Sequence, residues 1–316
     1  MQKPEISYLV VNSLKNNKEI GRQPLVSVIM NCYNSAQYLH EAIESVLAQT
    51  YSHWEIIFWD NQSTDESVSI FKSYSDKRLH YFLAPEHTKL GKARNLAVKQ
   101  ARGEWIGFLD CDDVWLPEKL EKQITIILEE DTELGLVYGQ MLVLAPHHDP
   151  SSKWSERMSL FSDKTLLNIL PEGWIFNKLL MLNFIPLLTA IVKRELYFDV
   201  GGISEHFEMS EDYELFVKVS AIRKVRAVQS VIALYRIHQS NSSILNLERQ
   251  FDESIEIVSR YLPDPAAARG LRYHHIYYAV SQIRNSQLWG GIHHLISYGG
   301  LWFILSFMRM KLISRI

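Results

Sequence analysis

The feature that most constrains this 316-residue chain is a regular alternation, over residues 26–109, of short apolar runs and segments with helical periodicity. Runs rich in β-branched and aromatic residues predict buried strands. The segments between them place apolar side chains three and four residues apart, which predicts helices. Strands that alternate with helices indicate an α/β fold with a mostly parallel sheet and helices on both faces. The predicted strands are residues 26–30, 55–59, 79–83 and 105–109, and the predicted helices are residues 39–47, 67–74 and 91–101.

Three of these predicted strands end in polar clusters, at residues 31–34, 60–65 and 110–113. Ligands of open α/β sheets bind beyond the carboxyl ends of the strands. If the three strands are neighbours, their clusters share one rim. The pattern loosens after residue 117, where we expect helices at 120–128 and 174–182, strands at 136–144 and 227–235, and helices from residue 247 onward.

Composition and charge exclude some classes of protein. The formal net charge is −3, whereas a nucleic-acid binder normally carries a basic excess. The N-terminus shows no basic segment followed by an apolar one, and no apolar stretch reaches the ~20 residues that span a bilayer. The two cysteines, Cys32 and Cys111, each follow an apolar run and favour free buried thiols in a reducing compartment. We therefore expect a cytoplasmic protein.

The sharpest cluster is the carboxylate triplet Asp110, Asp112 and Asp113, which follows a predicted strand. Close like charges raise one another's pKa unless a cation lies among them. Hard divalent cations such as Mg²⁺ or Mn²⁺ prefer carboxylate oxygens. The alternative is a solvated acidic turn before a helix near Pro117.

Other polar residues allow a structural and a functional interpretation. Asp60 either builds a turn or lines the ligand crevice, and both can hold together. Glu211 and Asp212 either start a helix, where negative charge opposes the helix dipole, or supply a carboxylate base. A lone histidine such as His238 is more often structural.

Five pieces of this chain, in order, resemble the family-2 glycosyltransferases, which have the GT-A fold and invert the anomeric centre. Each piece alone is moderately specific, but five in order are highly specific. The resemblance also reaches Tyr235-Arg236-Ile237-His238, which is similar to the family's late Arg-x-His. The five pieces are residues 26–34, residues 54–65, Gly91-Lys92-Ala93-Arg94-Asn95, residues 103–113 with the Asp-x-Asp motif, and residues 201–205 followed by Glu211-Asp212.

The resemblance implies a role for each matched residue. Asp112, helped by His238, would hold a divalent metal, Mn²⁺ or Mg²⁺, against the donor diphosphate. Asp212 would be the catalytic base, and Arg94 would meet a phosphate or Asp110. The implied donor-binding residues are Asn31, Tyr33, Asp60, Arg94 and Asp110, and the implied acceptor-side residues are Glu205 and Glu211.

The implied function is transfer of a sugar, from a nucleotide-sugar that is UDP-linked, to a saccharide or lipid-linked saccharide acceptor in bacterial surface polysaccharide or glycolipid assembly. Asn61-Gln62 departs from the family's usual Asp-Gly, which puts the base and ribose contacts in doubt. The alternatives are an inactive nucleotide-sugar-binding module, which would lack the base, and a flavodoxin-type phosphoacceptor domain. The implied organisation is an irregular lead-in (1–23), a GT-A domain (24–245) with donor (24–119) and acceptor (120–245) halves, and a helical extension (246–316).

The C-terminal tail has its own pattern. An apolar run at residues 301–308 precedes three basic residues, Arg309, Lys311 and Arg315, and no acidic residue follows Asp264. Such a segment suits the headgroup region of an anionic bilayer. We expect peripheral contact with the inner face of the plasma membrane. The alternative is a helical hairpin packed against the catalytic domain.

Overall fold

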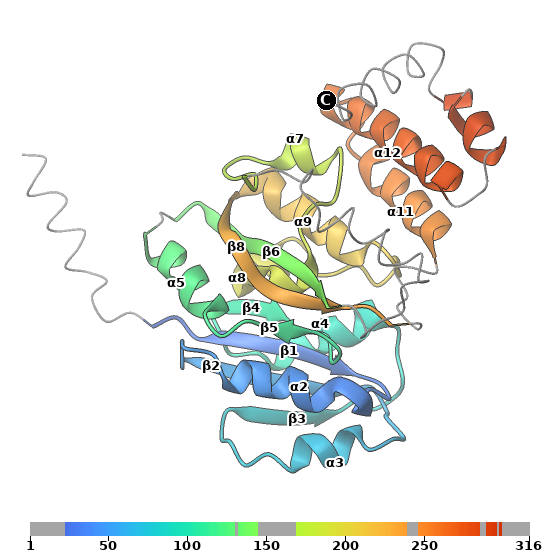
Figure 1. Cartoon of the computed structure of the whole chain (residues 1–316). Helices are drawn as coiled ribbons and strands as arrows, with labels where there is room; N and C mark the ends of the chain where they lie inside the picture. Colours follow the sequence, from blue (N-terminus) through green and yellow to red (C-terminus); the bar gives the residue numbers. More distant parts are fainter. Residues whose placement is uncertain are drawn as a thin grey trace, which may run out of the picture.

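The computed structural model describes residues 23–129, 132–144, 169–238, 246–284, 289–295 and 297–298. Strands in these ranges form one mixed sheet in the order β3-β2-β1-β4-β7-β6-β8-β5 (Figure 1). β1, β2, β3 and β4 run parallel, as predicted, whereas β7 is antiparallel to β4 and β6, and β5 to β8. The strands are β1 (Val26–Cys32), β2 (Trp54–Asp60), β3 (Leu79–Leu83), β4 (Trp105–Phe108), β5 (Val114–Trp115), β6 (Leu134–Leu144), β7 (Ile191–Lys193) and β8 (Lys224–Arg236).

Helices cover both faces of the sheet because successive strand residues point to opposite sides. In β1, Val28 belongs to the buried cluster that includes α2 and α5, and the next residue, Ile29, belongs to the cluster that includes α4 and α9. The α/β fold class with helices on both faces is therefore confirmed. The helices are α2 (Ala36–Leu47), α3 (Ser67–Lys72), α4 (Leu90–Gln100), α5 (Lys119–Glu129), α7 (Phe176–Leu179), η1 (Leu187–Thr189), α8 (Arg194–Asp199), α9 (Glu211–Ile222), α11 (Leu247–Ser259) and α12 (Pro265–Arg284).

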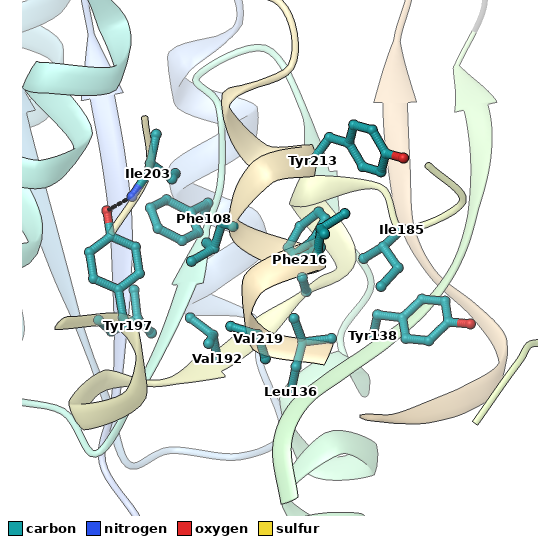
Figure 2. Packing of buried hydrophobic residues seen from close by; sticks show 14 of the residues in the cluster. Phe108, Leu136, Tyr138, Ile185, Val192, Tyr197, Ile203, Tyr213, Phe216 and Val219 are labelled. Carbon is teal, nitrogen blue, oxygen red and sulfur yellow. Dashed lines mark hydrogen bonds between the residues drawn. The ribbon is translucent and has the colours of Figure 1, made fainter. Parts of the chain in front are cut away.

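The core beneath α9 joins the two halves of the sheet (Figure 2). Phe216 and Val219 of α9 lie in the same buried cluster as Phe108 of β4 and Leu136 of β6. The backbone amide of Ile203 donates a hydrogen bond of 3.2 Å to the hydroxyl of Tyr197, which brings the loop before α9 onto this core. The start of α9 is thus supported by the packing of both halves.

Several elements differ from the sequence prediction. β5, β7 and α8 were not predicted, because two- to six-residue elements are too short to show a period. The predicted helix at 174–182 was too long, since the structure has only Phe176–Leu179 there. Predicted strand 227–235 extends to Lys224–Arg236.

In the described part of the C-terminal extension, α11 and α12 pack on the domain. Ile257 and Val258 of α11, with Ala266 and Ala267 of α12, belong to the same buried cluster as α4 and α9. Within the described ranges, no helix is both long enough and apolar enough to cross a membrane. The predicted lead-in up to residue 22 and the predicted membrane-contacting run at 301–308 lie outside the described residues.

A buried carboxylate holds the parallel strands together at the edge opposite the polar clusters. Glu55 of β2 accepts hydrogen bonds from Ser27 Oγ of β1 at 2.7 Å and from the Arg102 backbone amide at 2.8 Å. The Arg102 guanidinium adds contacts of 2.6 and 2.9 Å. Burial opposes ionisation of Glu55, but these hydrogen bonds outweigh it and lower its pKa.

We expect Glu55→Gln to lower the free energy of unfolding by about 2 kcal/mol at pH 7, because buried donors lose a charged acceptor. A carboxylate with a lowered pKa stabilises the fold above its unfolded-state pKa, and this contribution is lost as the pH falls. Urea denaturation should therefore show a constant difference from wild type between pH 7 and pH 5.5, and a difference that shrinks as the pH falls below about 4.5. The exposed control Glu129→Gln should change stability little, and an equal loss in both variants would contradict this role.

Candidate active site

Three polar clusters meet at the carboxyl edge of the parallel strands. Cys32 of β1 is in register with Asp60 of β2, and Ile29 is in register with Phe108 of β4. The strands are therefore neighbours, the condition on which the sequence predicted a shared rim, and Asn31, Asp60 and Asp110 lie at one edge of the sheet. Cys32 and Cys111 are both free and buried at this rim.

Asp60 is a buried residue that builds the turn after β2. One of its carboxylate oxygens accepts the Ser63 amide at 2.7 Å, and the other accepts the Tyr81 hydroxyl at 2.8 Å. Gln62 in this turn has φ of +72°, a conformation unusual for a side chain with a Cβ. The turn-building interpretation of Asp60 is thus correct, and its place at the rim keeps the ligand interpretation open.

Asn61 stands where the family usually has aspartate, and the structure gives it a structural task. Its side-chain amide donates to the Thr88 carbonyl at 2.7 Å and accepts from the Thr88 amide at 3.1 Å. Its own carbonyl lies 2.9 Å from His87 Nδ1. Asn61 therefore fixes the loop between β3 and α4 against the end of β2.

An aromatic pair that the sequence did not predict lies above this turn. The ring of Tyr33, half exposed, lies 4.3 Å from the ring of His87. Beside them is a shallow hollow of about 230 Å³ lined by His87, Lys89, Lys92 and Glu205, among others. The Asn31 side-chain nitrogen is buried and has no hydrogen-bond partner among the described residues. The two rings are tilted by 54° to one another and offer aromatic surface to a ligand. No periodicity or motif could have identified His87, because it lies in an irregular loop.

The carboxylate triplet separates into three environments. Asp110 is 44% exposed and faces Arg94, whereas Asp112 Oδ2 lies 2.6 Å from His238 Nε2. Asp113 is buried and accepts the Arg236 backbone amide at 2.8 Å, so it fixes β8. Burial and the neighbouring charge of Asp110 raise the pKa of Asp112, although His238 opposes this. A cation near Asp112 would relieve that cost.

Two further residues support the Asp112–His238 pair: Tyr38, which the sequence did not point to, and Arg236, which belongs to the matched Arg-x-His. The Tyr38 ring stacks 5.8 Å from the His238 ring and 4.4 Å from the Arg236 guanidinium. Arg236 Nε donates to the Asp112 carbonyl at 2.8 Å. Arg236 also pairs with Glu41. The pair is therefore held by β8 on one side and by α2 on the other.

Arg94 joins the donor half to the acceptor half. Its side chain is 3% exposed, and its Nη2 lies 2.8 Å from Asp110 Oδ1 while Nη1 lies 2.5 Å from Glu211 Oε1. The contact with Asp110 is one of the two that the sequence predicted for Arg94. Glu211 is thus an ion-pair partner at the first residue of α9.

Asp212 follows Glu211 and has different surroundings. It is partly buried, and the only hydrogen bond to its carboxylate from a described residue comes from the Tyr213 amide, at 2.6 Å. Burial and the negative charge of Glu211 raise its pKa to about 7, although Arg94 opposes the shift. A carboxylate that is poorly solvated and nearly free of donors is a suitable proton acceptor near neutral pH.

The segment before α9 packs closely on α4. Asn95 Nδ2 donates to the Ile203 carbonyl at 2.8 Å and to Glu205 Oε1 at 3.1 Å. A Cβ on Gly91 would lie 2.2 Å from the Ser204 carbonyl oxygen, so only glycine allows this approach. Glu205 is exposed and borders the hollow beside His87.

The residues present fit a divalent metal only as part of a larger coordination shell. No group of three His, Cys, Asp or Glu side chains in the described part of the chain could hold a metal by itself. Asp112 and His238 would supply one oxygen and one nitrogen ligand. Mg²⁺ is commonly held by one or two carboxylates together with waters and substrate phosphates. The pair therefore suits a metal that arrives with a diphosphate.

Comparison with known proteins places the chain in a family. Residues 27–176 match the model of "Glycosyl transferase family 2". The Escherichia coli protein WfgD, named UDP-Glc:alpha-D-GlcNAc-diphosphoundecaprenol beta-1,3-glucosyltransferase, is 30% identical over 267 residues, which cover 82% of this chain and 92% of WfgD. The chain is a family-2 glycosyltransferase.

Solved structures support the GT-A fold of this glycosyltransferase. S. aureus TarS 1-349 in complex with UDP-GlcNAc matches with a TM-score of 0.59 and 22% identity, over 83% of this chain and 73% of TarS 1-349. Mannosyltransferase PcManGT from Pyrobaculum calidifontis, in complex with GDP-Man and Mn²⁺, matches with a TM-score of 0.62 and 16% identity, over 98% and 88% of the two chains. At these identities the likeness shows the shared fold.

The raised pKa of Asp212 predicts that removing its charge stabilises the fold. An acid whose pKa is raised by folding loses stability as the pH rises from its unfolded-state value to its folded value. We expect Asp212→Asn to stabilise the glycosyltransferase by about 1–2 kcal/mol at pH 8 and to have little effect at pH 4. Thermal unfolding at both pH values measures this, and a variant that is less stable at pH 8 would contradict the raised pKa.

Proposed function

We propose that this glycosyltransferase transfers a sugar from a UDP-sugar to the hydroxyl of a saccharide or lipid-linked saccharide, with inversion, in bacterial surface polysaccharide assembly. The observation that carries the proposal is the separation of carboxylate roles at one rim. Asp112 pairs with His238, Asp110 pairs with Arg94, and Asp212 has only one hydrogen-bond donor among the described residues. The names of WfgD and of the TarS complex support the choice of donor and acceptor.

The reaction needs one base. Asp212 accepts the proton of the acceptor hydroxyl while that oxygen forms a bond to the anomeric carbon. The bond between this carbon and the donor diphosphate breaks, and its electron pair leaves with UDP. A single displacement by one base forms no covalent intermediate, which is why we assign inversion. An inactive binding module would need no carboxylate with the raised pKa of Asp212.

The donor side is assigned to the other residues of the rim. Asp60 and the Tyr33–His87 pair would contact the nucleobase, and Asn31 would donate to it. Asp112 and His238 would hold Mn²⁺ or Mg²⁺, which when bound neutralises the diphosphate charge. Asp110, fixed by Arg94, would contact the donor ribose or sugar. We place the donor half at residues 24–119, the acceptor half at 120–245 and the extension at 246–316.

Donor binding can be tested without knowing the acceptor. We expect UDP to raise the melting temperature of the wild-type enzyme, and Mn²⁺ to increase this shift, because ligands of the folded state stabilise it. In Asp112→Ala, Mn²⁺ should no longer increase the UDP-induced rise in melting temperature. In Asp60→Asn, UDP binding measured by calorimetry should be weaker. The exposed variant Asp252→Asn serves as the control. An unchanged Mn²⁺ increment in Asp112→Ala would remove Asp112 from the metal site.

The base can be tested by rate and by pH. Asp212→Asn should reduce kcat by at least ~10²-fold, the lower end for a general base, while UDP affinity stays near wild type. In the wild-type enzyme, kcat should rise with pH up to about 7, since Asp212 must lose its proton to act. Loss of UDP affinity with kcat retained at saturating donor would make Asp212 a binding residue instead.

We also propose that the extension contacts an anionic membrane surface, where a lipid-linked acceptor would lie. Arg269, Arg272, Tyr273 and Tyr277 recur on one face of α12, and all are exposed. Trp289 is 81% exposed. Tryptophan and tyrosine favour the membrane interface, and basic side chains are attracted to anionic lipids. Lys and Arg near such a surface contribute about 1 kcal/mol each.

Sedimentation with anionic and with neutral vesicles tests the membrane proposal. The wild-type chain should sediment with anionic vesicles, and added salt should weaken this binding. The double variant Arg269→Glu/Arg272→Glu should remain in the supernatant, whereas the control Lys77→Glu/Lys99→Glu, which reverses two exposed charges elsewhere, should still sediment. Equal sedimentation of both double variants would show that this face of α12 does not contact lipid.

A further inference from the structure

The segment that leads into α9 is held by a side chain from the extension. Glu253 of α11 accepts hydrogen bonds from three successive backbone amides, those of Glu208, Met209 and Ser210, at 3.0, 2.8 and 2.9 Å. Glu253 is only 7% exposed. Three donors that converge on one buried carboxylate fix both the position and the direction of this backbone.

The start of α9 does not cap itself. Ser210 occupies the N-cap position, where a serine normally accepts an amide of the first turn, but its side chain makes no such bond. The Ser210 hydroxyl instead donates to the Gln250 carbonyl of α11 at 3.3 Å. The local sequence therefore leaves the helix entry to be defined by α11.

Ion pairs around Glu253 reinforce the same junction. Arg249 contacts Glu253 at 3.1 Å and Glu208 at 2.6 Å. Lys89, which precedes α4, lies 2.5 Å from Glu208. Arg260, the C-cap residue of α11, pairs with Glu214 of α9. Side chains from both ends of the α11 segment thus contact the approach to α9 and its first turn, and this network reaches the donor half through Lys89.

Asp212 is the second residue of α9, two residues after the last amide that Glu253 holds. We propose that Glu253 is a positioning residue for Asp212, so that the C-terminal extension sets the geometry of the base. The inference rests on the proposed function of Asp212 as base. A displacement of about 1 Å at a reacting group can cost up to ~10²-fold in rate. Loss of the Glu253 carboxylate releases the three amides and lets Asp212 move.

The test compares Glu253→Gln with Asp252→Asn, the neighbouring exposed carboxylate on the same helix. We expect Glu253→Gln to lower kcat by ~10-fold or more, with the donor KM and UDP affinity unchanged. Glu253→Asp, which keeps a carboxylate, should recover part of the loss. Hydrogen exchange should be faster at the amides of residues 208–210 in Glu253→Gln and unchanged in Asp252→Asn. Unchanged exchange at these amides, or an unchanged kcat, would overturn the inference.

A double-mutant cycle separates this inference from the assignment of the base. If Glu253 acts through Asp212, Asp212→Asn/Glu253→Gln should be no slower than Asp212→Asn alone. If the loss of kcat in the double variant equals the product of the losses in the two single variants, the positioning role is overturned and the base assignment still stands. Full turnover in the single variant Asp212→Asn would overturn the base assignment itself. Calorimetry with UDP on the same samples shows that each variant is folded.

Discussion

The ion pairs of Arg94 are the interaction on which the rest of the site depends. A guanidinium that is 3% exposed costs free energy unless charged partners surround it, and Asp110 and Glu211 supply that compensation from opposite halves of the molecule. Burial alone would lower the pKa of Arg94, but the two carboxylates outweigh it and raise the pKa. Because one cation is shared by Asp110, which follows β4, and by Glu211 of α9, it links the donor rim to the start of α9.

The surroundings of each aspartate, rather than its residue type, determine its role in the site. Asp113 is buried against the backbone of β8 and is structural, Asp112 faces a histidine, and Asp110 is paired with Arg94. Asp212 lies beside Glu211 and away from donors, so its pKa rises to about 7. The same side chain thus serves as a structural anchor, a metal-ligand candidate and a base candidate within one rim.

The C-terminal extension packs together with the helices that carry the site. Its helices share a buried core with α4 and α9, and Glu253 completes the entry of α9 where Ser210 does not. Glu253 binds the backbone amides of the three residues that lead into α9, rather than those of its first turn, so it fixes the approach to the helix. A family match that ends at residue 176 therefore stops short of residues that shape the site.

The sequence by itself determined the α/β fold and the parallel donor half, because strand and helix periodicities alternate along the chain. It left the meeting of residues 31, 60 and 110 conditional on strand order, and the pairing of β1 with both β2 and β4 decided it. Only the tertiary structure decided how the carboxylates are partnered, since Arg94 and Glu211 are 117 residues apart and no local pattern couples them. The same holds for β7, which is recognisable only by its pairing between β4 and β6. It holds too for His87 and Glu253, whose surroundings come from packing between distant segments.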